Sequence, residues 1–201
     1  LAIKNHQEGK TDIAQKLYLQ VLRIKPNHSR ALNNLGIVFY TLGENQKAKE
    51  YYGKAIAINP NYADALNNLG VMYKNLGENQ KAKDCFEKTI AINPNYAGAY
   101  YNLGVIFQEL KENQKAKDCF EKAIELNPNY ADAHNDLGVI FQELQDYQKA
   151  KDCYEKTIAI NPNYISSHNN LGVIFKELGE DQQAIDCFEK AIEINPNYTD
   201  A

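Results

Sequence analysis

The sequence lacks three features that mark common functional classes. It has no uninterrupted apolar run of about 18 residues, so it predicts no membrane-spanning helix and no membrane partner. Basic residues are not in excess, because 22 Lys and Arg stand against 26 Asp and Glu and give a net charge of −4. Nucleic-acid binders usually carry a basic face, so nucleic acid is disfavoured as a partner. No secretory signal is visible, although the chain starts at Leu1 and we expect it to be part of a longer protein.

Cysteine is scarce and regularly spaced. The four cysteines, Cys85, Cys119, Cys153 and Cys187, follow one another at intervals of 34 residues. Disulfide frameworks have irregular spacings, so this pattern predicts buried thiols that pack as small hydrophobic groups. Reduced thiols favour a cytoplasmic location.

Patterns typical of catalysis are missing as well. A zinc site needs Cys and His at short spacings, which the regular cysteines do not provide. The glycines fall inside expected helices rather than in a phosphate-binding loop, and no nucleophile lies beside a base. We therefore predict no enzymatic activity, no cofactor and no metal for this chain.

What the sequence does contain is a repeat. All six prolines are 34 residues apart, and a glycine keeps the same step: Pro26, Pro60, Pro94, Pro128, Pro162, Pro196, then Gly36, Gly70, Gly104, Gly138 and Gly172. A fixed period of this length indicates one supersecondary unit that is copied and stacked. An array of this kind can function by presenting an extended surface to a binding partner.

One repeat, residues 63–96, predicts two helices. Apolar residues recur at helical spacing before Gly77 and again after it, and Gly77 is expected at positive φ in the turn between the helices. Pro94 ends the second helix, and Asn95 is expected to cap the next one. Gly70 in mid-helix predicts a close approach of two helices, with Ala82 opposite. The sequence thus predicts an all-α fold of antiparallel helix pairs.

The signature of one repeat resembles the tetratricopeptide repeat. In residues 29–62 the matching residues are Leu32, Leu35, Gly36, Phe39, Ala48, Tyr52, Ala55 and Pro60. The resemblance predicts a partial repeat at 1–28, whole repeats at 29–62, 63–96, 97–130, 131–164 and 165–198, and the start of a further one at 199–201. It implies an α-α superhelix, or solenoid, whose first helices line a concave groove that binds a peptide or partner protein. His134 and His168 replace a core Leu, and packed imidazoles are expected there.

Polar residues before the Leu-Gly pair are the candidate binding residues. The sixth residue of each repeat is Asn34, Asn68, Asn102, Asp136 or Asn170, and the fifth is Asn33, Asn67, Tyr101, Asn135 or Asn169. Asn is a poor helix former, and its amide can hydrogen bond a peptide backbone. The sixth-position row is similar to the asparagine ladder of O-linked N-acetylglucosamine transferases, which implies backbone contacts to a peptide. The alternative is that these residues bridge adjacent first helices, and Asp136 is expected to favour a basic ligand group.

The predicted groove also includes four residues that lie further along the same expected face, Lys74, Gln108, Gln142 and Lys176. The function predicted is a protein-interaction scaffold. Two alternatives stay open, namely the substrate-targeting region of a larger enzyme such as a glycosyltransferase, and a self-assembling array. Self-association is predicted through the ends, where Ile185, Phe188 and Ile192 would be partly exposed.

Overall fold

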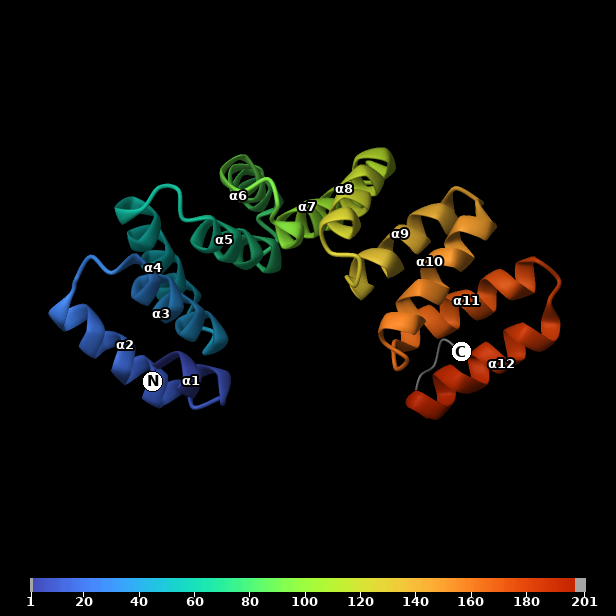
Figure 1. Cartoon of the computed structure of the whole chain (residues 1–201), viewed down its shortest axis with the longest axis horizontal. Coiled ribbons are helices and arrows are strands. Elements are labelled where there is room, and N and C mark those ends of the chain that lie inside the picture. The colour runs from blue at the N-terminus through green and yellow to red at the C-terminus, as the bar shows by residue number, and fades with distance from the viewer. Residues whose placement is uncertain (1, 198–201) are drawn as a thin grey trace. The chain divides into compact units, whose positions relative to one another are not determined.

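The described part of the chain is built from helices joined by short turns (Figure 1). The computed structural model describes residues 2–197, without the side chains of residues 3, 6 and 7. The twelve helices in this range are α1 (Ala2–Gln7), α2 (Thr11–Ile24), α3 (Ser29–Thr41), α4 (Asn45–Ile58), α5 (Ala63–Asn75), α6 (Asn79–Ile92), α7 (Ala97–Glu109), α8 (Asn113–Leu126), α9 (Ala131–Glu143), α10 (Tyr147–Ile160), α11 (Ile165–Glu177) and α12 (Asp181–Ile194). The predicted all-α solenoid of helix pairs is confirmed. The repeat start predicted at 199–201 lies outside the described residues.

The chain divides into two compact halves, one ending at Ala99 and the other beginning at Tyr100. In the N-terminal half, α3 packs on α4 and α5 packs on α6, and the second helices α2 and α4 also contact the first helices α3 and α5 of the next repeats. In the C-terminal half, the pairs α9–α10 and α11–α12 follow the same scheme, and α10 contacts α11. Each repeat is therefore stabilised mainly by its neighbours in sequence.

A glycine-to-ring contact holds the two helices of each repeat together. A Cβ on Gly36 would lie 2.7 Å from the Tyr52 ring, which is too close for any side chain. The other mid-helix glycines give 2.6 Å to the equivalent ring: Gly70 to Phe86, Gly104 to Phe120, Gly138 to Tyr154 and Gly172 to Phe188. The expected close approach of the two helices is therefore present. The sequence predicted Ala82 opposite Gly70, whereas the nearest atoms belong to the ring of Phe86. The contact explains why each repeat keeps a residue that costs about 1 kcal/mol in a helix.

The turn within each repeat places one residue in the left-handed region. Gly43, Gly77 and Gly179 have φ of 76°, 74° and 75°, as the sequence predicted for Gly77. Lys111 and Gln145 occupy the same repeat position with φ of 58° and 59°. Glycine adopts this conformation at no steric cost, whereas a residue with a Cβ is strained there. Gly9 has the same position in the first, partial repeat with φ of 72°, so two of the six turns carry strain that the other four avoid.

The turn between repeats is closed by the asparagine before proline. The side-chain oxygen of Asn93 accepts a hydrogen bond from the backbone N–H of Asn95 at 3.1 Å. Four other turns repeat this bond, from residues 61, 129, 163 and 197 to Asn59, Asn127, Asn161 and Asn195. The expectation that Asn95 caps the next helix is wrong, because α7 begins at Ala97 and Tyr96 stands between them. The equivalent residues before α5, α9 and α11 are Tyr62, Tyr130 and Tyr164, and none of their side chains caps the helix.

The histidines and cysteines take structural positions. The Nε2 atoms of His134 and His168 lie 3.0 and 2.9 Å from the carbonyl oxygens of Pro128 and Pro162, so packed and hydrogen-bonded imidazoles are confirmed. Burial raises the pKa of Cys85 to about 11, which keeps the thiol protonated and unreactive. All four cysteines are free thiols.

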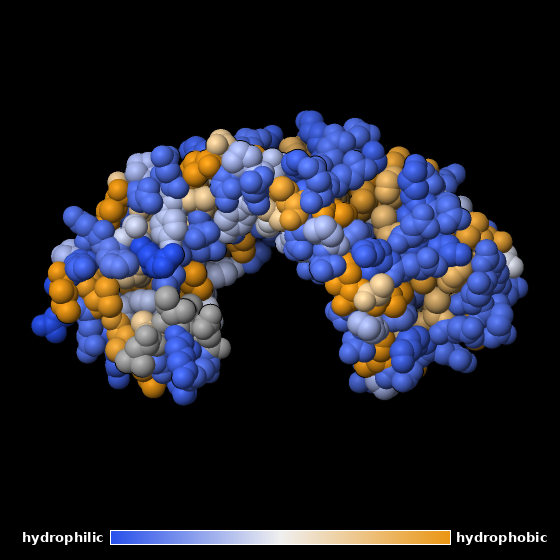
Figure 2. Space-filling model, viewed as in Figure 1, coloured by the Kyte–Doolittle hydropathy of each residue, from blue (hydrophilic) through white to orange (hydrophobic). Residues whose placement is uncertain are grey.

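Exposed hydrophobic residues are scattered among hydrophilic ones on the face shown in Figure 2. On α12, Ile185 and Ile192 are 48% and 44% exposed, and Phe188 is half-buried. The partial exposure expected of this helix is present, while self-association through it stays a prediction. None of the described helices is long and apolar enough to span a bilayer.

Replacement of the two strained turn residues by glycine should stabilise the protein. We expect Lys111→Gly and Gln145→Gly each to raise the free energy of unfolding by about 0.5–1 kcal/mol, because the left-handed strain exceeds the extra entropy of glycine in the unfolded chain. Urea denaturation followed by circular dichroism measures the change. Lys88→Gly, in the middle of α6, is the control and should lose about 1 kcal/mol. Destabilisation by both turn variants would contradict the strain assigned to these positions.

Candidate functional site

The predicted polar residues form two rows with different exposure. The fifth-position row consists of Asn33, Asn67, Tyr101, Asn135 and Asn169. Its four asparagines are buried, at 3–9% exposure, and Tyr101 is half-buried. The sixth-position row consists of Asn34, Asn68, Asn102, Asp136 and Asn170, and all of these are half-buried. The sixth-position row is thus the more accessible of the two.

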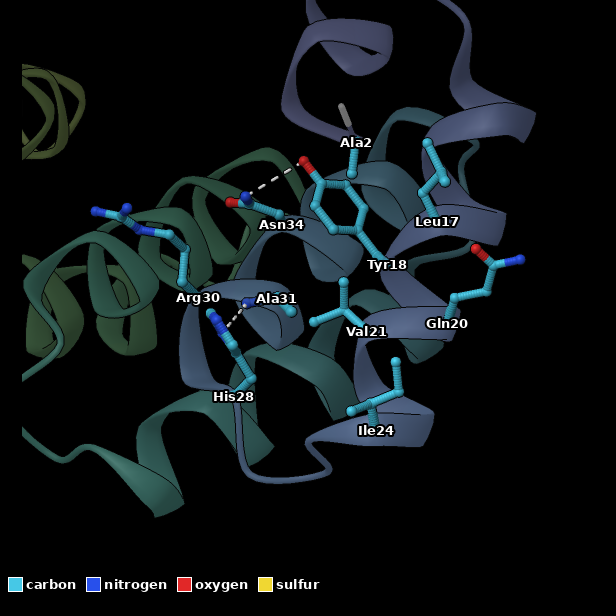
Figure 3. Close-up of a pocket in the computed structure, with 10 residues that line it drawn as sticks. All are labelled: Ala2, Leu17, Tyr18, Gln20, Val21, Ile24, His28, Arg30, Ala31 and Asn34. Carbon is cyan, nitrogen blue, oxygen red and sulfur yellow. Dashed lines mark hydrogen bonds between the residues drawn. The ribbon is translucent and has the colours of Figure 1, made fainter.

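In the N-terminal half the two rows are joined by amide hydrogen bonds. Asn68 Nδ2 donates to Asn33 Oδ1 at 3.0 Å, which links α5 to α3. Asn33 Nδ2 donates to Asn34 Oδ1 at 3.3 Å. Asn34 Nδ2 donates to the hydroxyl of Tyr18 at 3.3 Å, as Figure 3 shows at the wall of a cavity of about 480 Å³ between α2 and α3. The amides therefore bridge successive first helices.

In the C-terminal half a tyrosine and a carboxylate replace one amide pair. The Tyr101 hydroxyl donates to Asp136 Oδ2 at 3.1 Å, and Asn135 Nδ2 donates to Asp136 Oδ1 at 3.0 Å. Asn135 Oδ1 in turn accepts from Ser167 Oγ at 2.8 Å. Burial, and then the nearby Asp136 charge, raise the pKa of Tyr101, so the hydroxyl remains a donor.

This bond explains why the sixth-position row contains one aspartate. Asn33 accepts a hydrogen bond from the next sixth-position residue, whereas Tyr101 donates one. The two oxygens of Asp136 accept one bond each, from Tyr101 and from Asn135, and its charge strengthens both bonds. The two departures from the asparagine pattern, Tyr101 and Asp136, therefore contact each other. The expected preference of Asp136 for a basic ligand group stays untested.

Tyrosines on the second helices extend the network, a role that sequence reasoning missed. Tyr154 donates its hydroxyl proton to Gln142 Oε1 at 2.8 Å and forms a hydrogen bond with Asn170. Its ring packs on Gly138, and Tyr18, which binds Asn34, has the same repeat position. The side-chain oxygens of Asn67 and Asn169 are buried without a hydrogen-bond partner in the described part of the chain. Each of these unpaired oxygens lowers the free energy of unfolding by about 1–3 kcal/mol.

A cavity of about 320 Å³ opens on the first-helix face of the N-terminal half. It lies between α3 and α5, and Tyr62 and Tyr96, which precede first helices, contribute aromatic walls. Its other lining residues are Arg30, Asn33, Asn34, Ile37, Asp64 and Asn68. Burial raises the pKa of Tyr62, and a hydrogen bond with Arg30 opposes that rise. The cavity thus unites three predicted residues, Asn33, Asn34 and Asn68, with one charge of each sign.

Other predicted residues are not brought into this cavity. Lys74, Gln108 and Asn102 are half-buried and Lys176 is exposed, and none of these side chains forms a hydrogen bond within residues 2–197. Peptide contact stays a prediction for every residue of both rows. In the described residues no group of His, Cys, Asp or Glu side chains could hold a metal ion.

The pairing of Tyr101 with Asp136 can be measured by a double-mutant cycle. We expect Tyr101→Phe and Asp136→Asn each to destabilise the protein by about 1–2 kcal/mol, with a coupling energy of about 1 kcal/mol, since both remove one charge-assisted hydrogen bond. Urea denaturation of the four proteins gives the coupling. Asp132, on the same helix, binds Tyr164 instead, so a cycle of Tyr101→Phe with Asp132→Asn should be nearly additive. Equal coupling energies in both cycles would contradict a specific hydrogen bond between Tyr101 and Asp136.

Comparison with known proteins places this geometry in a family. The tetratricopeptide repeat profile matches residues 29–62, 63–96, 97–130, 131–164 and 165–198. The crystal structure of MamA is similar, with a TM-score of 0.72 and 32% identity over 81% of this chain and 95% of that chain. A comparison with curated protein sequences finds no match.

Two further solved structures share the fold. PilF of Pseudomonas aeruginosa has a TM-score of 0.92 and 23% identity over 100% of this chain and 91% of its own. YrrB, described as a TPR protein with an unusual peptide-binding site, has a TM-score of 0.72 and 21% identity over 91% of this chain and 94% of its own. Because the repeat profile covers most of the sequence and MamA exceeds 30% identity, the chain belongs to the tetratricopeptide repeat family.

Proposed function

We propose that the protein is an interaction scaffold that binds an extended peptide segment of a partner protein along its first-helix face. The observation that carries this proposal is the cavity between α3 and α5, which is lined by the half-buried amides of Asn34 and Asn68 and by two tyrosine rings. Shape, aromatic walls and a few oriented polar groups are what a peptide site needs. The proposal assigns no catalytic step to the chain.

Spare hydrogen-bonding capacity in the cavity supports backbone recognition. Asn68 uses one N–H on Asn33, which leaves its second N–H and its Oδ1 without a partner in the described residues. Asn34 uses its Oδ1 and one N–H on Asn33 and Tyr18, which leaves one N–H. These free groups match the C=O and N–H that every peptide residue presents. Recognition would then depend little on the side chains of the peptide.

The two rows take different parts in this proposal. The buried Asn33 and Asn135 hold the sixth-position side chains Asn34, Asn68 and Asp136 in place by hydrogen bonds. Asn34, Asn68, Asn102 and Asn170 are the contacts, in the manner of the asparagine ladder of O-linked N-acetylglucosamine transferases. Asp136 already accepts two hydrogen bonds from the protein, so it serves as a support.

The rim of the cavity gives a weak charge preference. Arg30 and Asp64 are both exposed and carry opposite charges. A peptide with either sign of charge can therefore be accommodated. YrrB has a peptide-binding site on a similar fold, which agrees with a binding role for this chain.

Loss of the two cavity amides should weaken peptide binding. Peptides would be selected from a phage-displayed random library on the wild-type protein and titrated by fluorescence anisotropy. We expect Asn34→Ala/Asn68→Ala to lower the affinity of the best peptide about tenfold or more, because each lost hydrogen bond is worth about 0.5–1.5 kcal/mol.

Asn75→Ala is the matched control. Asn75 is also on α5 and also donates to a side chain of α3, the Tyr40 hydroxyl, but it is exposed and does not line the cavity. Its variant should bind the peptide as the wild type does. Unchanged affinity in the double variant, with its helical content intact, would contradict the proposed site.

A further inference from the structure

The second-helix side of the molecule carries two equivalent grooves of different chemistry. One lies between α2 and α4, with a volume of about 420 Å³, and the other between α8 and α10, with about 400 Å³. Five lining positions correspond exactly by repeat number: Leu19 with Glu121, Leu22 with Ile124, Leu32 with His134, Tyr51 with Cys153 and Lys54 with Lys156. The lining residues of the α2–α4 groove can therefore be compared, position by position, with those of the α8–α10 groove.

The α2–α4 groove differs from its equivalent at two lining positions, where Leu19 and Tyr51 stand in place of Glu121 and Cys153. Leu19 is 39% exposed at a position that holds glutamate in four other repeats, at residues 87, 121, 155 and 189. Tyr51 stands where the four following repeats have their cysteine. Leu19 therefore places a large apolar group on a wall that faces solvent, and the partly buried Tyr51 lines the same groove and packs on the core.

The walls of the α2–α4 groove are already held in place. The Tyr51 ring stacks on Phe39 with centroids 5.2 Å apart and planes 16° apart. Lys54 Nζ lies 5.1 Å from the Tyr51 centroid and 2.5 Å from Glu50 Oε1. Leu32 forms the floor, is 4% exposed and belongs to the core. A ligand would therefore meet a preformed surface and would order few side chains on binding.

The unpaired charge that lines this groove is positive. Lys54 is paired with Glu50, whereas residues 13–28, which form most of α2 and the turn after it, contain Lys16, Arg23 and Lys25 and no Asp or Glu. Arg23 lines the groove and forms no ion pair with any described residue. The equivalent α8–α10 groove instead carries Glu121 and Asp152. Charge complementarity thus points to an acidic occupant of the α2–α4 groove.

We propose that the α2–α4 groove is a second interaction site, which takes an apolar side chain from an acidic segment of a partner protein. Leu19, Leu22 and Tyr51 contact the apolar side chain, and Arg23 pairs with a flanking carboxylate. This site lies on the second-helix side and does not use the first-helix cavity. It would let the scaffold hold two segments at once.

The test uses short fluorescein-labelled peptides and the whole chain. One peptide has a single central Phe between Glu and Asp residues, a second has Ala in place of Phe, and a third has Lys and Arg in place of the acids. We expect only the first to bind in fluorescence anisotropy. Leu19→Glu should weaken its affinity about tenfold or more, and Arg23→Gln should weaken it and reduce its dependence on salt. Glu155→Gln, at the repeat position of Leu19, is the control and should leave the affinity unchanged.

Several outcomes would overturn this second site. Failure of the acidic Phe peptide to bind, or equal binding to wild type and Leu19→Glu, would do so. Loss of binding in Asn34→Ala/Asn68→Ala but not in Leu19→Glu would assign the peptide to the first-helix cavity instead. Binding of wild type to phosphatidylserine vesicles, lost in Leu19→Glu, would identify the patch as a surface for anionic lipid. Circular dichroism of Leu19→Glu confirms folding, which is expected because the side chain is partly exposed.

Discussion

The contact between a glycine in the first helix of each whole repeat and an aromatic ring in the paired second helix is the constraint on which the other features depend. With rings such as Phe86 only 2.6 Å from where a Cβ would be, a side chain at Gly70 would force the buried ring to move. The contact sets the distance between paired helices, and its repetition every 34 residues makes successive repeats equivalent. Because the helices are held this way, positions next to the glycine can carry polar residues without loss of the fold.

That freedom is used in the fifth and sixth positions. The fifth-position row is mostly buried, and three of its members, Asn33, Tyr101 and Asn135, are hydrogen bonded across repeats, whereas the sixth-position row is half-buried. The pair Tyr101 and Asp136 shows that the rows are coupled, because a change in one repeat is matched in the next. A polar network of this kind fixes side chains before a peptide binds. Binding therefore costs little conformational entropy of these side chains. The variation of Leu19 and Tyr51 on the opposite helices indicates that each face can diverge independently.

The sequence predicted the fold well, because periodicity reports directly on which residues are buried. Helix pairs, the positive φ of Gly77 and the packed histidines all followed from spacing and residue type. Residue type alone did not predict the left-handed conformation of Lys111, although the 34-residue spacing gives Lys111 the repeat position of Gly77. It also could not separate binding from bridging asparagines, because neighbouring positions on a helix differ in exposure only once the next helix is in place. The network tyrosines were missed for the same reason, as their rings satisfy the packing pattern and conceal the role of the hydroxyl.

The most direct measurement is a crystal structure of the chain with the tightest peptide selected from the random library. The account predicts an extended peptide on the first-helix face of the N-terminal half, with its backbone within hydrogen-bond distance of the Asn34 and Asn68 side chains, while Asn33 keeps its bond to Asn68. A peptide bound elsewhere, or one that makes only side-chain contacts and leaves both amides free, would contradict it.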